Sequence, residues 1–172
     1  MPPEQTVVLR PEEEADIPAI REVHRIAFGT ELEAKLVDAL REQNHLRLSL
    51  VAELDGQVVG HLALSELTIH APQGPIAALA LAPVAVLPAH QRQGIGTRLV
   101  RECIGAGRKL GYGIMLVLGH PEYYPRFGFS PELAQPLDAP YAGEAFMALE
   151  LLPNALRGVT GKVEYARPFS QL

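Results

Sequence analysis

Residues 84–98 read VAVLPAHQRQGIGTR, and this stretch is the most informative part of the sequence. An apolar run ends in a proline, a polar turn follows, and Gly94 and Gly96 then stand at the start of a helical pattern. Glycine lets a ligand approach the backbone closely, and the first amides of a helix carry partial positive charge. With the cations of Arg92 and Arg98, the stretch predicts an anion-binding cradle between a buried strand and a helix.

Paired glycines before a helix also occur in plain tight turns, so other nucleotide-binding patterns need to be compared. A dinucleotide-binding fold requires a third glycine where Leu99 stands, and an acidic residue where Leu118, Gly119 and His120 stand. A Walker loop requires Gly-Lys-Ser/Thr, which this stretch lacks. Both nucleotide-binding patterns are therefore excluded.

Two motifs in the correct order carry a resemblance to a known family. The pattern Gln91-x-x-Gly94-x-Gly96 after an apolar strand resembles the pyrophosphate-binding signature of the GNAT N-acetyltransferase superfamily. Downstream, YYPRFGF at 123–129 resembles the short helix on which many GNAT enzymes carry a catalytic tyrosine, and Tyr124 holds that place. The segments LGHPEYYPRFGF (118–129) and EAKLVDALR (33–41) are similar to one bacterial branch of predicted acetyltransferases.

The resemblance implies an enzyme that moves an acetyl group from acetyl-CoA to a primary amine by direct attack. It assigns Tyr124 as the general acid for the CoA thiolate. It assigns backbone contacts with the pantetheine arm and the thioester to Val84, Ala85 and Val86. The remaining implied CoA-binding residues follow that strand, and they are Gln91, Arg92, Gln93, Gly94, Ile95, Gly96, Thr97 and Arg98.

Several assignments stay open at this level. The base that deprotonates the amine is Glu66, His120, Glu122 or a chain of water molecules. Aromatic packing would explain Tyr123 and Tyr124 without the upstream glycine motif; with it, we assign chemistry to Tyr124 and packing to Tyr123. A non-catalytic acyl-CoA-binding sensor or regulatory module is the alternative function, because the cradle supports binding without turnover.

Along the chain, hydrophobic periodicity predicts an α/β fold in which helices accompany a mixed sheet. The resemblance to GNAT enzymes implies that the central sheet is mostly antiparallel and flanked by helices. The predicted strands are 6–10, 48–54, 57–67, 76–87, 114–118, 144–151 and 159–165, and the predicted helices are 16–29, 31–43, 94–110 and 121–127. Asp16 is the predicted N-cap of the first helix, and Asp55-Gly56 predicts a two-residue hairpin turn. A loop is expected over 71–75. Pro83 predicts a bulge or a place where strand pairing is lost, because it has no N–H. We expect a single domain over 1–172, with a core at 6–151 and a tail at 152–172.

Composition limits the partners and the compartment. Fifteen Lys and Arg against 20 Asp and Glu give a net charge of −5, which disfavours a nucleic-acid partner. The longest apolar run, 76–87, is too short to span a bilayer, so no membrane partner is expected. The opening Met1-Pro2-Pro3-Glu4 lacks the features of a signal peptide, so we expect a cytoplasmic protein.

The chemistry-bearing side chains outside the two motifs suggest no further centre. The single cysteine, Cys103, follows a helical apolar pattern and is assigned to the core. The six histidines form no ligand-spaced cluster, so no metal is expected. The expected acceptor is a small-molecule or peptide amine, and a homodimer is left open.

Overall fold

One open sheet runs through the part of the chain that the computed structural model describes, residues 6–140 and 143–171. Its elements are β1 (Val7–Pro11), η1 (Glu14–Asp16), α1 (Ile17–Phe28), α2 (Leu32–Glu42), β2 (Leu46–Leu54), β3 (Gln57–Ala71), β4 (Gly74–Val86), η2 (Pro88–His90), α3 (Ile95–Lys109), β5 (Ile114–Leu118), η3 (Tyr124–Phe127), α4 (Pro131–Ala134), β6 (Leu137–Asp138), β7 (Phe146–Glu150), β8 (Gly161–Glu164) and η4 (Arg167–Gln171), where η marks a 3-10 helix. The strand order is β1-β2-β3-β4-β5-β7, with β8 beside β3 and β6 beside β8. Only β4–β5 and β6–β8 pair in parallel among the described strands, so the predicted fold class is confirmed.

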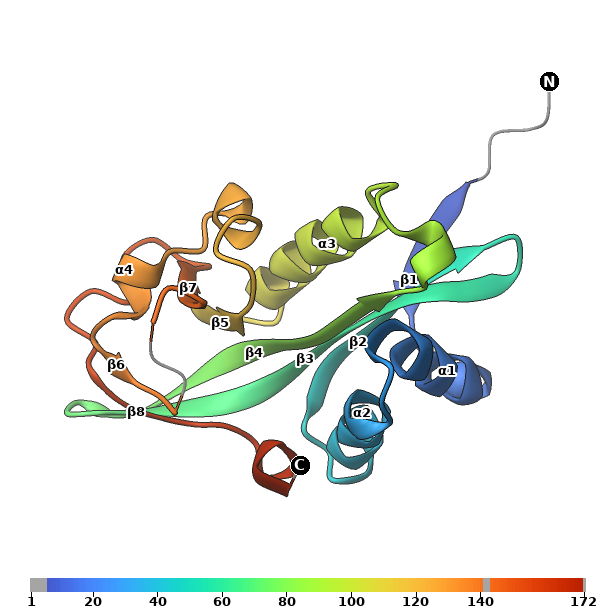
Figure 1. Ribbon diagram of the computed structural model, residues 1–172. Helices are drawn as coiled ribbons and strands as arrows, with labels where there is room; N and C mark the ends of the chain where they lie inside the picture. Colours follow the sequence, from blue (N-terminus) through green and yellow to red (C-terminus); the bar gives the residue numbers. More distant parts are fainter. Residues whose placement is uncertain (1–5, 141–142, 172) are drawn as a thin grey trace.

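The helices cover the two faces of the sheet unequally. Figure 1 shows α3 on one face and α1 with α2 on the other. Beneath α3, the side chains of Leu99 and Cys103 are fully buried against strand residues such as Leu62. Cys103 is therefore a core residue, as predicted, and burial raises the pKa of its thiol. On the other face, the buried side chains of Ile20 and Val37 pack α1 and α2 against the sheet.

Asp16 occupies the N-cap position of α1, as predicted, but its side chain makes no capping hydrogen bond to that helix. Asp16 has helical backbone angles and lies at the end of η1, directly before α1. Its carboxylate accepts hydrogen bonds from the Arg10 guanidinium at 2.7 and 2.9 Å and from the Glu13 N–H at 2.7 Å. The residue that caps this turn is Glu13, because the reciprocal Glu13–Asp16 hydrogen bonds form a capping box.

The two predicted strands around Asp55-Gly56 form a hairpin, with Leu54 opposite Gln57. The expected loop at 71–75 is instead mostly strand, since β3 and β4 stay paired up to Ala71 and Gly74. Pro75 was a reason to predict a loop, but at the end of a hairpin its missing N–H breaks few ladder bonds. The segment expected as a tail contributes β8, which pairs with β3 along Thr68–His70.

Pro83 lies at a bulge in β4, as predicted. The β3–β4 register passes from Leu64 opposite Leu81 to Leu62 opposite Val84, so Ala82 and Pro83 face one β3 residue. On its other side, β4 pairs with β5 only at Leu79–Met115 and Ala80–Leu116. Both strands are described in full, and past these pairs they no longer run together. After the bulge, β4 therefore has no neighbouring strand on its β5 side.

A buried polar chain ties α1 to the sheet. Ser49 donates to the Glu12 carboxylate at 2.6 Å, the Ser49 oxygen lies 2.8 Å from His61 Nε2, and His61 Nδ1 lies 2.8 Å from His24 Nε2. Burial alone would raise the pKa of Glu12, but hydrogen bonds from Arg41 and Ser49 outweigh it and lower that pKa. An ionised Glu12 only accepts, which fixes both imidazoles as neutral donors at Nε2. Burial likewise lowers the pKa of both histidines.

The chain carries no membrane-crossing helix within its described ranges, since none is both long and apolar enough. Residues 1–4, on which the expectation about a signal peptide rests, lie outside the described residues.

We expect the free energy of unfolding to fall as the pH is lowered from 7 to 5. Burial lowers the pKa of His24 to about 4 in the folded protein, whereas an unfolded histidine titrates near 6.5. Below pH 6.5 the unfolded state gains a proton that the folded state does not bind, so stability present above 6.5 is lost toward pH 4. His24 alone accounts for a loss of about 1–2 kcal/mol between pH 7 and pH 5.

Urea unfolding at several pH values measures this dependence. The His24→Phe variant should show a shallower pH slope, while the exposed His70→Gln control should keep the parental one. Equal slopes in the parent and His24→Phe would contradict the assignment.

Candidate functional site

Two pockets meet where β4 and β5 separate. The pocket on the α3 side, called here the α3 pocket, has a volume of about 780 Å³. The other, called the α1–α2 pocket, has a volume of about 460 Å³ and is walled by the ends of α1 and α2 and by the C-terminal segment. Three residues line both pockets: Val84, His120 and Tyr124. The gap beside the β4 bulge therefore connects two spaces on opposite faces of the sheet.

The edge of β4 at this gap offers backbone hydrogen-bonding groups. Leu87 donates its N–H to the Val59 carbonyl at 2.8 Å. Because antiparallel ladders alternate, the backbone groups of Val84 and Val86 then point away from β3, toward the gap. The Val86 carbonyl accepts a hydrogen bond from Gln91 Nε2 at 2.9 Å. An extended chain laid in the gap can hydrogen-bond to the remaining groups as an added strand would.

The start of α3 contributes backbone N–H groups to the α3 pocket. Gly94 adopts a left-handed conformation with φ of 82° and precedes the helix with no side-chain cap. The first-turn N–H groups thus have no intrahelical partner, which suits phosphate oxygens. A Cβ on Gly96 would lie 3.8 Å from Val86 Cγ2 and 4.0 Å from the Tyr123 hydroxyl. Larger side chains there would project into the lined space.

The α3 pocket has a second cation that the sequence analysis did not assign. Arg126 lines the pocket with Arg92. Its Nε donates to the Tyr123 carbonyl at 2.8 Å, and its guanidinium lies 4.4 Å from the Tyr123 ring centroid. The Tyr123 hydroxyl is 2.8 Å from Thr97 Oγ1, which fastens η3 to α3. A 3-10 helix has three residues per turn, so positions 123 and 126 lie on the same side of it. This spacing could have identified Arg126 from the sequence.

Tyr124 is the first residue of η3, and it lies at the junction of the two pockets because it lines both. The predicted helix over 121–127 is shorter than expected, since only Tyr124–Phe127 are helical. The Tyr124 ring makes edge contacts with Tyr123 at 5.1 Å and Phe129 at 5.8 Å between centroids. Burial, followed by the neighbouring Tyr123 and Cys103, raises the pKa of Tyr124 to about 12. The phenol therefore keeps its proton at neutral pH.

Gly119 determines where the Tyr124 ring can lie. A Cβ built on Gly119 would come within 2.8 Å of Tyr124 Cδ2 and closer still to Cε2. No side chain fits between the end of β5 and this ring without moving it. The glycine thus lets the ring pack directly on the backbone of residue 119.

The structure brings most of the predicted CoA-binding residues together. Those that line the α3 pocket are Val84, Ala85, Val86, Gln91, Arg92, Gly94, Ile95, Gly96 and Thr97. Gln93 is exposed and does not contribute to the lining. Arg98 points elsewhere, because its guanidinium donates to the Val7 carbonyl on β1 at 3.0 Å. The helical rotation of about 100° per residue carries position 98 away from the loop.

The three candidate bases differ in whether they line the two pockets. Glu66 lies outside both linings, where it accepts hydrogen bonds from the Tyr112 hydroxyl at 2.7 Å and from Arg47 at 3.3 Å. Glu122 is exposed and also lies outside both linings. His120 lines both pockets, so it is the one candidate of the three that reaches the junction.

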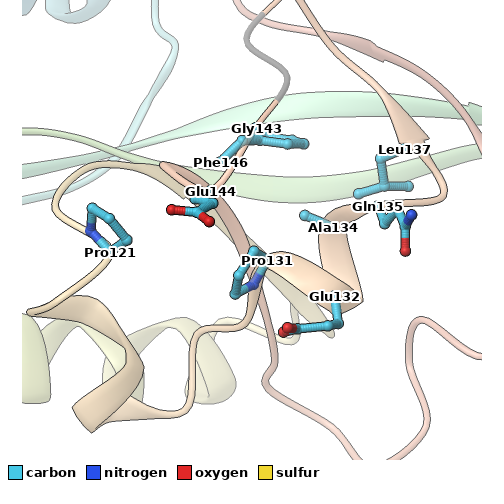
Figure 2. Close-up of a pocket in the computed structure, with 9 residues that line it drawn as sticks. All are labelled: Pro121, Pro131, Glu132, Ala134, Gln135, Leu137, Gly143, Glu144 and Phe146. Carbon is cyan, nitrogen blue, oxygen red and sulfur yellow. The ribbon is translucent and has the colours of Figure 1, made fainter.

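Another hollow, of about 640 Å³, lies between α4 and the start of β7 and shares no lining residue with the first two. Figure 2 shows Glu132 and Glu144 among its lining side chains, with Pro121 at one end. It contains none of the predicted site residues. Across the described ranges, no group of three or more His, Cys, Asp or Glu is placed to hold a metal ion.

Comparisons with known proteins identify the family. The family model for the acetyltransferase (GNAT) domain matches residues 8–131. The uncharacterized N-acetyltransferase YhbS of Escherichia coli K12 is 36% identical over 168 residues, which covers 96% of this chain and 99% of that protein. The uncharacterized N-acetyltransferase YjhQ of the same strain is 36% identical over 163 residues, covering 91% and 90%.

Two solved structures are also similar. The crystal structure of Escherichia coli YhbS in complex with CoA superposes with a TM-score of 0.90 at 36% identity, covering 99% of this chain and 95% of that one. A GNAT acetyltransferase of Brucella melitensis in complex with acetyl-CoA gives a TM-score of 0.81 at 36% identity, covering 95% and 98%. The family model and both relatives span most of the chain, and the protein therefore belongs to the GNAT acetyltransferase family.

Proposed function

We propose that this protein transfers the acetyl group of acetyl-CoA to a primary amine by direct attack, with Tyr124 as the general acid. The observation that carries the proposal is the place of Tyr124. Its hydroxyl-bearing ring stands where the α3 pocket and the α1–α2 pocket join. A group at that junction can reach a bond that breaks between a donor in one pocket and an acceptor in the other.

The α3 pocket fits CoA by charge and by shape. The α3 amides, Arg92 and Arg126 offer positive charge for the pyrophosphate. The backbone groups of Val84 and Val86 offer strand-like hydrogen bonds to the pantetheine amides. The CoA and acetyl-CoA in the two similar structures support this assignment.

The transfer balances as follows. The amine nitrogen forms a bond to the thioester carbon, the C–S bond breaks, and the products are an amide and a thiol. A phenol with a pKa of about 12 is a weaker acid than a thiol of pKa near 8.5, so full proton transfer to sulfur is uphill by itself. The balance closes when the proton lost by the attacking nitrogen returns to the Tyr124 phenolate. That proton travels through His120 or through water.

A non-catalytic acyl-CoA-binding module remains the alternative, because the cradle alone accounts for binding. The position of Tyr124 favours the enzyme, since a phenol that lines both pockets is placed beside both the donor and the acceptor proposed here. A homodimer stays a prediction.

The cradle assignment predicts that Gly96→Val weakens CoA binding about tenfold or more, because the new side chain projects into the space beside the α3 amides. Isothermal titration calorimetry with CoA measures the dissociation constant. Gly105→Val is the matched control, since Gly105 also lies on α3 but has open space around it. Unchanged affinity in Gly96→Val, with a folded protein, would refute the cradle.

Tyr124→Phe keeps the ring and its packing but removes the proton donor. With an accepted amine, kcat should fall by about 10² to 10⁴, while CoA affinity changes little. Steady-state thiol release measures the rate, and Tyr123→Phe, which should cost far less, is the control. A parental rate in Tyr124→Phe would assign the acid to another group. Tight acetyl-CoA binding without thiol release for any amine would favour the binding module.

Gly119→Ala tests whether the placement of the Tyr124 ring matters. The added methyl would displace the ring, so kcat should drop about tenfold or more, in the direction of Tyr124→Phe. Gly119 lines the α1–α2 pocket and not the α3 pocket. The dissociation constant for CoA should therefore stay near the parental value. If kcat in Gly119→Ala equals the parental kcat, the ring position is not limiting.

A further inference from the structure

The α1–α2 pocket has a composition that restricts which amine it can hold. Its walls are largely apolar and include Phe28, Leu36, Leu118, Tyr165 and Phe169. These side chains come from the end of α1, from α2, from β5 and from the C-terminal segment. Tyr165 and Phe169 lie with ring centroids 5.3 Å apart, and Phe169 packs against Leu36. The pocket therefore presents an aromatic and aliphatic surface to its occupant.

The mouth of the pocket is apolar as well. Phe28 is 42% exposed and Leu118 is 48% exposed, although both are large hydrophobic side chains. Leu32, next to the lining residue Glu33, is 50% exposed. Exposed apolar side chains gathered around a pocket mark a surface that gains stability when an apolar ligand covers it.

One carboxylate and one imidazole, those of Glu33 and His120, line the pocket. Glu33 is its one acidic lining residue, and no Lys or Arg contributes to the lining among the described residues. The Glu33 carboxylate accepts a hydrogen bond from the Thr30 hydroxyl at 3.0 Å. It forms no ion pair with any cation in residues 6–140 or 143–171. This half-buried anion can attract the ammonium form of an amine into the pocket.

The α3 pocket shows the opposite pattern, since Arg92 and Arg126 line it. An acceptor with its own carboxylate would find no cation in the α1–α2 pocket and would lose solvation on entry. A polyamine would leave all but one ammonium group without an acidic partner. A polyhydroxylated amine would bury hydroxyl groups against apolar walls, at a similar cost.

We propose, on the basis of the function proposed above, that the acceptor is a monoamine on an aromatic or bulky apolar body with no carboxylate beside the nitrogen. Glu33 favours a positively charged amine. Phe28 and the Tyr165–Phe169 pair favour an aromatic or apolar group attached to the nitrogen. Two sources share this chemistry: a free arylalkylamine, and the N-terminus of a peptide that begins with a large apolar residue.

The first experiment compares acceptors in a thiol-release assay with the full-length protein and saturating acetyl-CoA. Phenethylamine represents the free amine, and phenylalanine adds only the carboxylate. A tripeptide amide that begins with Phe represents the peptide source, and spermidine and an aminoglycoside represent polar amines. We expect kcat/KM for phenethylamine or the peptide to exceed that for phenylalanine, spermidine and the aminoglycoside by about tenfold or more. The higher of the first two identifies the source.

The second experiment changes the walls and measures the KM for the preferred amine and for acetyl-CoA separately. Glu33→Gln should raise the amine KM about tenfold without moving the acetyl-CoA KM, since the one carboxylate that lines the pocket is lost. Glu31→Gln is the matched control, because Glu31 lies outside the pocket and its carboxylate is 3.7 Å from Lys35 Nζ. Phe28→Ala should reduce the preference for phenethylamine over ethylamine.

The outcomes separate this inference from the function on which it rests. Higher kcat/KM for spermidine, the aminoglycoside or phenylalanine, with turnover lost in Tyr124→Phe, would overturn the acceptor class and leave the acetyltransferase intact. An amine KM that responds equally to Glu33→Gln and Glu31→Gln would overturn the role of Glu33. Absence of thiol release with every amine, despite tight acetyl-CoA binding, would contradict the proposed function and the acceptor class together.

Discussion

The short ladder between β4 and β5 is the constraint on which the rest of the site depends. The two strands pair at Leu79–Met115 and Ala80–Leu116 and then separate. Immediately beyond, Pro83 brings no N–H to the sheet, and the β3–β4 register shifts around it. A continuous ladder would place β5 against the Val84 and Val86 backbone groups. The separation instead leaves those groups facing a gap, and both pockets open from it.

The gap joins two faces of the sheet with different electrostatic character. On the α3 face, helix amides and the guanidinium groups of Arg92 and Arg126 favour a polyanion. On the other face, α1 and α2 supply apolar walls and the carboxylate of Glu33. Under the proposed function, charge and wall polarity together would direct a phosphate-rich donor to one side and an apolar cation to the other. Tyr124 stands where the two occupants would meet, and Gly119 makes room for its ring.

Local signals in the sequence predicted much of this arrangement. The features that the sequence did not predict were missed for physical reasons. The Asp55-Gly56 hairpin, the bulge at Pro83 and the start of α3 each depend on backbone properties of one or two residues, which sequence shows directly. Arg98 was assigned to the cradle because it is near in sequence, but helix rotation turns it toward the Val7 carbonyl. The short elements α4 and β6 went unpredicted because four and two residues are too few for a periodic pattern. The walls of the α1–α2 pocket come from segments more than 130 residues apart, so no local pattern indicates them.

The buried histidines explain how the apolar walls are held against the sheet. His24 lies one turn before Phe28, and their rings stack at 5.9 Å between centroids. His24 in turn contacts His61 on β3, directly opposite Ala85 in the β3–β4 register. A purely apolar contact would let α1 slide, because dispersion forces have little directional preference. The hydrogen-bonded chain from His24 to Glu12 has one geometry and one set of tautomers, so it fixes α1 relative to the strand that borders the gap. The α1 wall of the α1–α2 pocket and the β4 edge at the gap are therefore positioned by the same hydrogen-bonded chain.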